Sequence, residues 1–258
     1  MHNLSKISFS NKNLDISKVN KVFKKQGIIV IKNFFEKSLI ENIASSILNL
    51  ISKIEKGNQK LNCNFKIIYS SNSKYSYQEK IKSEKTILEF RDREDYGMID
   101  IFNFDKSFEE GQILKKKILD EKLISILEQA LNKKIELENF NIYYNKGIVK
   151  TRGYHIDSYK NRFKLFVYLT NCESANDGPF SFILQSHNTF FFRTINRIYN
   201  KIFMKNNTDM NLYNKLNEAK IYGDSGTIFL SNQKGFHRGW PQSKNGKRLV
   251  AVLNLKFH

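Results

Sequence analysis

The chain has 258 residues, with 43 lysines and arginines against 25 aspartates and glutamates, and a formal net charge of +18. This length suits one large domain or two small ones and allows a substantial core. Two prolines, twelve glycines and 40% hydrophobic residues exclude a collagen-like or disordered chain. No stretch approaches the roughly 20 apolar residues that span a bilayer, and the start lacks the apolar core of a signal peptide.

Cys63 and Cys172 are the only cysteines, and neither lies in a CxxC pattern. Free thiols in a reducing compartment are the default for such residues. We therefore expect a soluble, cytoplasmic protein.

The positive charge is scattered along the chain, without a basic tail. The sequence is rich in Lys, Asn and Ile together, the residues of A/T-rich codons, so biased composition accounts for much of this charge. The alternative is an anionic substrate or partner. We expect a small-molecule or conjugated substrate, which can itself be anionic, and no nucleic-acid partner.

The first half reads mainly as helices. Apolar spacing predicts helices over 16–26, 38–56 and 111–131, and a short apolar strand over 27–31. Residues 58–85 are polar and uneven, which predicts loop with short strands. Without a linker or an internal repeat, a single domain over 1–258 is expected.

From about residue 135 the period changes to that of strands, which marks off a helix-rich part at about 1–134. The predicted strands are short, β-branched or aromatic and bounded by turn residues, at 135–145, 163–170, 179–184, 226–231 and 248–256. Helices followed by a series of strands predict an α+β, mainly β chain. Its second half, about 135–258, is expected to form a β-sandwich or jelly roll.

One segment interrupts the strands. TFFFRTINRIYNKIFMK, residues 189–205, has apolar residues at helical spacing and Arg193, Arg197, Lys201 and Lys205 on the other side. A basic amphipathic helix can lie on a membrane or bind an acidic partner. We expect instead that its apolar face packs on the domain near the site, within a helical insertion at about 189–220.

His155 and Asp157 lie two residues apart in RGYHIDSYK, just before a predicted buried strand. Residues i and i+2 of a strand face the same side, so the imidazole and the carboxylate should lie close together. His237 follows another predicted strand, TIFLS. Two imidazoles and one carboxylate form the facial triad that binds non-haem Fe(II), and they suit Fe(II) or Mn(II) better than a thiolate-bound zinc.

Arg248 lies eleven residues after His237, at the start of the predicted strand in GKRLVAVLNL. An arginine is rarely placed in a core without an anion to hold. A carboxylate of a small acid would meet that requirement.

These residues resemble the motifs of iron(II)/2-oxoglutarate-dependent dioxygenases, and the flanking sequence is similar to the phytanoyl-CoA dioxygenase (PhyH-like) family. The HxD at 155–157, the KxxxYL strand from Lys164 to Leu169, and His237 with Arg248 carry the resemblance. Further similar segments are FKKQGIIVIKNFF (23–35), DGPFSFILQSH (177–187) and GTIFLSNQKGFHRGWP (226–241). The resemblance covers nearly the whole chain, and residues 58–110 match least.

The resemblance implies a double-stranded β-helix (jelly roll, cupin-like) core with N-terminal and inserted helices packed against it. It implies Fe(II) held by His155, Asp157 and His237, with Arg248 on the distal carboxylate of 2-oxoglutarate. The implied reaction uses O2 as second cosubstrate, hydroxylates a C–H bond of a small or conjugated organic substrate, and releases succinate and CO2. The resemblance does not name the substrate.

Two positions depart from the family pattern. Gly239 stands where Ser or Thr often helps to bind the cosubstrate, and Gln185 begins a QSH in place of the usual PGSH. The first departure can pass that role to a residue such as Tyr143. On the same predicted strand, Asn141, Tyr144 and Asn145 are equally placed to take it. Related halogenases carry a small residue at the position of Asp157, so halogenation is not expected.

Other charged or aromatic residues have two readings each. Arg91, Arg93 and Asp95 form either a substrate-binding lip or a solvated loop with mutual salt bridges. Arg152 and Lys164 flank the HxD segment and face either substrate or solvent, while Trp240 either lines the pocket or packs elsewhere. His187 is the competing histidine, which we expect to bind backbone in the core. The candidate substrate-binding residues are Arg91, Arg93, Arg152, Lys164 and Trp240.

Two other functional classes remain open from the sequence. One is a cupin-like metal-dependent isomerase or lyase that needs no 2-oxoglutarate. The other is a non-enzymatic basic binding module, which would bind phosphates with a steep salt dependence.

Overall fold

The computed structural model describes residues 2–56, 65–92, 95–160, 162–212 and 217–257. The helices are α1 (His2–Ser5), η1 (Asn11–Asn13), α2 (Ile16–Gln26), α3 (Lys37–Glu55), α4 (Tyr77–Ile81), α5 (Phe104–Ser107), α6 (Glu109–Ile118), α7 (Glu121–Leu131), η2 (Ala175–Asp177), η3 (Ser186–Asn188) and α8 (Phe190–Ile202). The strands are β1 (Ser8–Ser10), β2 (Ile28–Lys32), β3 (Phe65–Tyr69), β4 (Thr86–Phe90), β5 (Ile99–Phe102), β6 (Ile135–Lys146), β7 (Phe163–Tyr168), β8 (Phe180–Ile183), β9 (Glu218–Ile221), β10 (Ile228–Asn232), β11 (His237–Gly239) and β12 (Lys247–Phe257).

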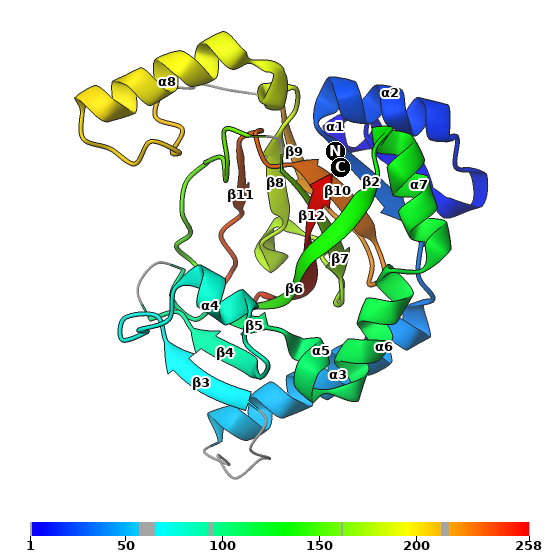
Figure 1. The fold of residues 1–258 in the computed structure, drawn as a ribbon, viewed down its shortest axis with the longest axis vertical. Helices are drawn as coiled ribbons and strands as arrows, with labels where there is room; N and C mark the ends of the chain where they lie inside the picture. Colours follow the sequence, from blue (N-terminus) through cyan, green and yellow to red (C-terminus); the bar gives the residue numbers. More distant parts are fainter. Residues whose placement is uncertain (1, 57–64, 93–94, 161, 213–216, 258) are drawn as a thin grey trace.

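The described strands form two sheets. The large one has the order β1-β2-β10-β7-β12-β6-β5-β4-β3, and the small one has the order β11-β8-β9. Pairing is antiparallel except between β1 and β2 and between β3 and β4. The α+β expectation is therefore confirmed, with the sheets at the centre and the helices around them (Figure 1).

Strand alternation divides the core into two layers. Along β12, Leu249, Ala251 and Leu253 pack with the helices, whereas Val250 and Val252 pack with strands of the small sheet. A strand sends successive side chains to opposite faces, so a run that is apolar at every position is buried on both sides. The large sheet is thus the middle layer, and its Val250 face looks toward the candidate site.

The helices on the other face are α2, α3, α6 and α7, whose apolar stripes enter the larger core. α2 begins where the side chain of Asp15 accepts the N–H of Lys18, and it ends at Gly27. Gly27 has a φ of 82° and donates its N–H to the carbonyl of Phe23. The left-handed conformation favours glycine there, and the predicted end of the helix is confirmed.

The expected single helix over 111–131 is wrong, because the chain turns between α6 and α7. Asp120 caps the start of α7 by accepting the N–H of Lys122, which gives the second helix its own start. On α6, Ile113 is 39% exposed. Strands β4 and β5 also lie in a region that the sequence did not resolve into elements.

The expectation that the amphipathic segment packs its apolar face on the domain is wrong, because its polar face is the buried one. α8 forms inside the expected range, but its buried side chains are Arg193, Asn196 and Asn200, whereas Phe191 and Ile202 are exposed. Polar partners decide this, because both asparagines donate to the carbonyl oxygen of Asp209 and Arg193 donates to that of Ser186. In Figure 1 the helix extends away from the rest of the fold. β9 begins at residue 218, close to the expected end of the insertion.

Within the described ranges, no helix combines the length and the apolar character that crossing a bilayer requires.

Candidate metal centre

Backbone pairing brings the HxD segment and the second histidine together. His155 lies between β6 and β7, and its N–H donates to the carbonyl of His237 at 3.0 Å, which is matched by the reverse bond at 2.9 Å. The N–H of Asp157 donates to the carbonyl of Gln233 at 3.1 Å. Residues 82 apart in the chain are thereby fixed as neighbours by main-chain hydrogen bonds.

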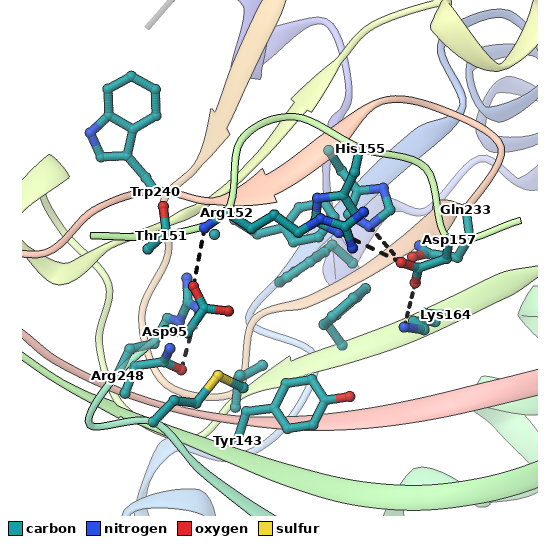
Figure 2. A pocket seen from close by; sticks show the side chains of 18 of the residues that line it. Asp95, Tyr143, Thr151, Arg152, His155, Asp157, Lys164, Gln233, Trp240 and Arg248 are labelled. Carbon is teal, nitrogen blue, oxygen red and sulfur yellow. Dashed lines mark hydrogen bonds and ion pairs between the residues drawn. The ribbon is translucent and has the colours of Figure 1, made fainter. Parts of the chain in front are cut away.

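The three side chains converge on one point. Oδ1 of Asp157 lies 3.6 Å from Nε2 of His155 and 3.5 Å from Nε2 of His237. All three possible ligand atoms lie within 4.8 Å of one another. Figure 2 shows the imidazole of His155 directed toward the carboxylate of Asp157.

The other ring nitrogen of each histidine is held by backbone. Nδ1 of His155 lies 2.9 Å from the carbonyl oxygen of Gly153, and Nδ1 of His237 lies 2.9 Å from that of Gly235. A carbonyl oxygen only accepts, so Nδ1 carries the proton in both rings. Each Nε2 therefore presents a lone pair to the centre, as metal ligation requires.

The protonation states also suit metal binding. Burial and the neighbouring His237 lower the pKa of His155 to about 4, so this ring is neutral at neutral pH. Burial opposes the charge on Asp157, but Lys164 and His237 outweigh it and hold the pKa of that carboxyl well below its usual range. Imidazole nitrogens and a carboxylate are the ligand types that suit Fe(II) or a similar divalent ion.

A cavity of about 280 Å³ opens beside these residues. Its wall includes the aromatic rings of Phe166, Phe180 and Phe229 together with the three candidate ligands. The Phe180 ring stacks on His237 with centroids 5.4 Å apart. The cavity is thus lined by apolar rings as well as by charged groups such as Arg152 and Lys164.

Arg248 lies in the same cavity and is 7% exposed. Its Nη1 donates to the carbonyl of Gly178, and its Nη2 lies 3.4 Å from Oδ1 of Asn145. Its buried Nε has no hydrogen-bond partner among the described residues. A buried guanidinium with an unused donor, on a cavity wall, can hold an anion.

The structure separates the alternatives on β6. Tyr143 and Asn145 line the cavity, whereas Tyr144 packs in the opposite core. Asn141 is buried on the Tyr143 side of the strand but does not line this cavity. Burial raises the pKa of Tyr143 to about 12, so its hydroxyl stays protonated and can donate.

Charged side chains from three segments lie around the cavity. Nε of Arg91 donates to Asp100 at 2.7 Å and its Nη1 to Asp95 at 3.0 Å. Arg152 binds Asp209, with its Nε 2.9 Å from Oδ1. Arg93, the other arginine of this cluster, lies outside the described residues.

Trp240 and Lys164 also line the cavity, but in different settings. Nζ of Lys220 lies 3.4 Å from the centroid of the Trp240 ring. Nζ of Lys164 lies 2.6 Å from Oδ2 of Asp157, so this lysine contacts a candidate ligand directly. Asp157 raises the pKa of Lys164 in spite of its burial, which keeps the lysine charged.

His187 lies away from the candidate ligands. It is buried against Gly27, and its Nε2 lies 3.1 Å from the carbonyl oxygen of Lys24. Burial lowers its pKa. The ring thus joins η3 to the end of α2, as expected for a histidine that binds backbone.

Gln233 is a cavity residue that the sequence analysis did not single out. It is buried next to Asp157, and its Oε1 has no hydrogen-bond partner among the described residues. Its place four residues before His237 is the only sequence signal, and the loop between β10 and β11 decides where it points.

Comparisons with known proteins match this fold to solved structures, some of which contain a bound metal or 2-oxoglutarate. HygX from Streptomyces hygroscopicus, solved with nickel and 2-oxoglutarate bound, is 15% identical with a TM-score of 0.59, over 91% of this chain and 84% of that one. EctD from S. alaskensis with bound Fe is 14% identical with a TM-score of 0.60, over 97% and 79% of the two chains. SnoN, a non-heme alpha ketoglutarate dependent epimerase from nogalamycin biosynthesis, is 8% identical with a TM-score of 0.61, over 93% and 82%.

No protein-family model matches the sequence, and no curated protein matches it. At these identities the structural similarity shows a shared fold. The structural neighbours include proteins with iron, or nickel and 2-oxoglutarate, bound, and this chain has a group of three residues that could hold a metal ion.

Proposed function

We propose that this chain is an Fe(II)- and 2-oxoglutarate-dependent dioxygenase of the phytanoyl-CoA dioxygenase (PhyH-like) family, built on a double-stranded β-helix. The observation that carries the proposal is one cavity with two kinds of site. It contains the converging Nε2 atoms of His155 and His237 with Oδ1 of Asp157, and also the buried Arg248 with an unused donor. The fold shared with 2-oxoglutarate-binding proteins supports the same reading.

The proposed roles follow from the chemistry of each group. His155, Asp157 and His237 hold Fe(II), and Arg248 pairs with the distal carboxylate of 2-oxoglutarate. When bound, the iron with 2-oxoglutarate and O2 supplies the oxidising chemistry, with succinate and CO2 released. Lys164 keeps Asp157 ionised and oriented. Phe166, Phe180 and Phe229 limit water beside the reacting groups.

The proposed outcome is hydroxylation of a C–H bond in a small or conjugated organic substrate. Arg91 and Arg152 line the cavity and are candidates to position an anionic group of that substrate, with Trp240 as a flat apolar wall. Arg93 stays a candidate from the sequence alone. Both arginines bind carboxylates of the protein, so an anionic substrate would have to compete with Asp95 or Asp209.

The test is anaerobic addition of Fe(II) and 2-oxoglutarate to the purified apoprotein. A weak visible charge-transfer band, followed by succinate formation when O2 is admitted, is the expected result. His155→Gln and Asp157→Ala should lose both signals while circular dichroism shows a folded chain. His187→Gln is the matched control, because that ring lies outside the cavity, and it should keep both signals.

Absence of the band in folded, metal-loaded protein would contradict the proposal. Because Fe(II) is bound in that result, it would favour the isomerase or lyase class, which needs no cosubstrate. A folded protein that binds no Fe(II) would contradict both metal-dependent classes, and metal binding is measured separately from the band.

A further inference from the structure

The exposed face of α8 is apolar. Phe191, Ile198 and Ile202 are 77%, 54% and 68% exposed, and Ile195 lies between them on the same face. At 100° per residue these four positions form one continuous stripe, which we call the α8 stripe. The neighbouring Phe203 and Met204 extend the exposed apolar surface past the end of the helix.

The buried, polar face of α8 is fixed by hydrogen bonds, which oppose a rotation of the helix that would bury the stripe. Asn200 donates to the carbonyls of Asn206 and Asp209, and Oδ1 of Asn196 accepts the N–H groups of Asn211 and Leu212. Turning the helix to bury the stripe would break these bonds and leave buried polar groups unpaired, which is costly. The stripe is therefore held outward by the polar face.

Positive charges run beside the stripe. Arg197 and Lys201 lie one turn apart along one edge, Lys205 follows the helix, and all three are exposed. No ion pair within the described part of the chain involves them, and the sequence of α8 contains no carboxylate. The edge therefore presents uncompensated positive charge next to a large apolar surface.

We propose that α8 docks this protein on an anionic lipid bilayer surface. The α8 stripe enters the boundary between headgroups and acyl chains, while Arg197, Lys201 and Lys205 contact the negative headgroups. An apolar face flanked by basic residues has both terms that bind interfacial helices, namely buried apolar area and attraction to anionic lipid. The net charge of +18 adds a long-range attraction of the same sign.

The docking helix is joined to the candidate metal centre by short contacts. The loop after α8 pairs with the HxD segment, because Asp209 lies opposite His155 and the N–H of Ile156 donates to the carbonyl of Thr208. Arg152, which lines the cavity, also binds the side chain of Asp209. Docking through α8 would thus hold the metal-site segment at a fixed place relative to the bilayer.

The experiment is co-sedimentation of the full chain with large unilamellar vesicles of phosphatidylcholine alone or mixed with phosphatidylglycerol. We expect binding to the mixed vesicles and much weaker binding to phosphatidylcholine. Ile198→Ser with Ile202→Ser removes apolar area without changing the charge, and should weaken binding more than about tenfold. Its control is Ile113→Ser on α6, at an exposed isoleucine far from α8, which should bind like the parent.

A second pair of variants tests the charge. Lys201→Gln with Lys205→Gln should weaken binding to the mixed vesicles at least about fivefold, since each basic residue near an anionic surface contributes about that factor. Lys116→Gln with Lys117→Gln removes the same charge from an exposed surface of α6 and should have a smaller effect. Equal effects of the two pairs would show that only net charge attracts the protein, and would overturn the docking role of α8.

Two further outcomes would overturn the proposal. One is a parent protein that does not bind the mixed vesicles. The other is a dimer, seen by analytical ultracentrifugation without vesicles, that the two serine substitutions convert to a monomer while vesicle binding does not occur. In that case a second copy of the chain, and not lipid, covers the stripe.

Discussion

Lys164 and Asp157 form a direct ion pair in which Nζ lies 2.6 Å from Oδ2, while Oδ1 of the same carboxylate faces the two imidazoles. One oxygen is thus engaged by the protein and the other is left toward the metal centre. The pair orients the carboxylate and keeps it ionised, as outer groups do around many metal sites. Lys164 therefore has a positioning role in this arrangement.

Lys164→Met should weaken Fe(II) binding by about 10–100-fold, because Asp157 loses both its orientation and the charge that lowers its pKa. The loss of Fe(II) affinity should be larger at about pH 5 than at about pH 8. Without Lys164 the carboxyl of Asp157 protonates more easily, and protonation competes with the metal. Competition against a chromophoric chelator measures the affinity. Lys164→Arg should recover part of it. An affinity equal to that of the parent at both pH values would contradict this role.

Arg248→Met should raise the apparent KM for 2-oxoglutarate by about 10–100-fold, since a charge-assisted hydrogen bond to a carboxylate contributes about 1.5–3 kcal/mol. The variant should bind Fe(II) like the parent, because Arg248 makes none of the contacts around the candidate ligands. Steady-state succinate formation and metal titration provide the two measurements. An unchanged KM would place the cosubstrate elsewhere.

Gly239→Ser should lower the KM for 2-oxoglutarate a few-fold. A Cβ at this position would lie 3.6 Å from Nη2 of Arg248, an ordinary contact, so the added hydroxyl would stand beside the proposed carboxylate site. One added hydrogen bond of about 1 kcal/mol corresponds to about a fivefold change. Gly239→Ala adds the Cβ without the hydroxyl and should leave KM near the parent value. Equal effects of the two substitutions would show that space, and not hydrogen bonding, controls this position.

The metal-free protein should lose stability as the pH falls from about 6.5 toward 4. Burial and His237 lower the pKa of His155 to about 4, below the value of about 6.5 expected in the unfolded chain. Between these values the unfolded state binds more protons, so the free energy of unfolding falls with falling pH, by up to about 3 kcal/mol from this group. Urea titrations in the presence of a chelator measure the trend. His155→Gln should flatten it, and an equally steep decline in that variant would assign the effect to other groups.

Gly27→Ala should destabilise the fold by about 2–4 kcal/mol. Gly27 has a positive φ, and an added Cβ would overlap the ring of the buried His187. Removing that ring in Gly27→Ala/His187→Ala should recover less than the full loss, because the backbone strain remains. Gly153→Ala is the matched control, since nothing lies within 4 Å of its Cβ position. Thermal unfolding followed by circular dichroism gives the comparison, and similar Tm values for the two glycine variants would contradict it.

Strands β6, β7, β8, β10 and β12 of the second half could be predicted because their signal is local, whereas the short β9 and β11 were missed. The run Leu249–Leu253 is apolar at every position, and such a run becomes a strand buried on both faces. β4 and β5 were missed because their short apolar stretches adjoin the charged segment around Arg91 and Asp95. β5 pairs with both β4 and β6, and these pairings supply the stability that the local sequence lacks.

By itself, the sequence determined the residue types and spacing of the candidate site, since an HxD, a later histidine and a distant arginine can be read from one chain. It also determined five strands of the second half and where α2 ends. Only the tertiary structure decided which atom of each candidate ligand faces the metal centre. It also decided that Lys164 forms an ion pair with Asp157, and that Arg91 and Arg152 line one cavity. It also decided that α8 buries its polar face, because Asn196 and Asn200 found their partners in the loop around Asp209. Helical periodicity shows that a face is apolar, but only the groups that meet the helix in space determine which face is buried.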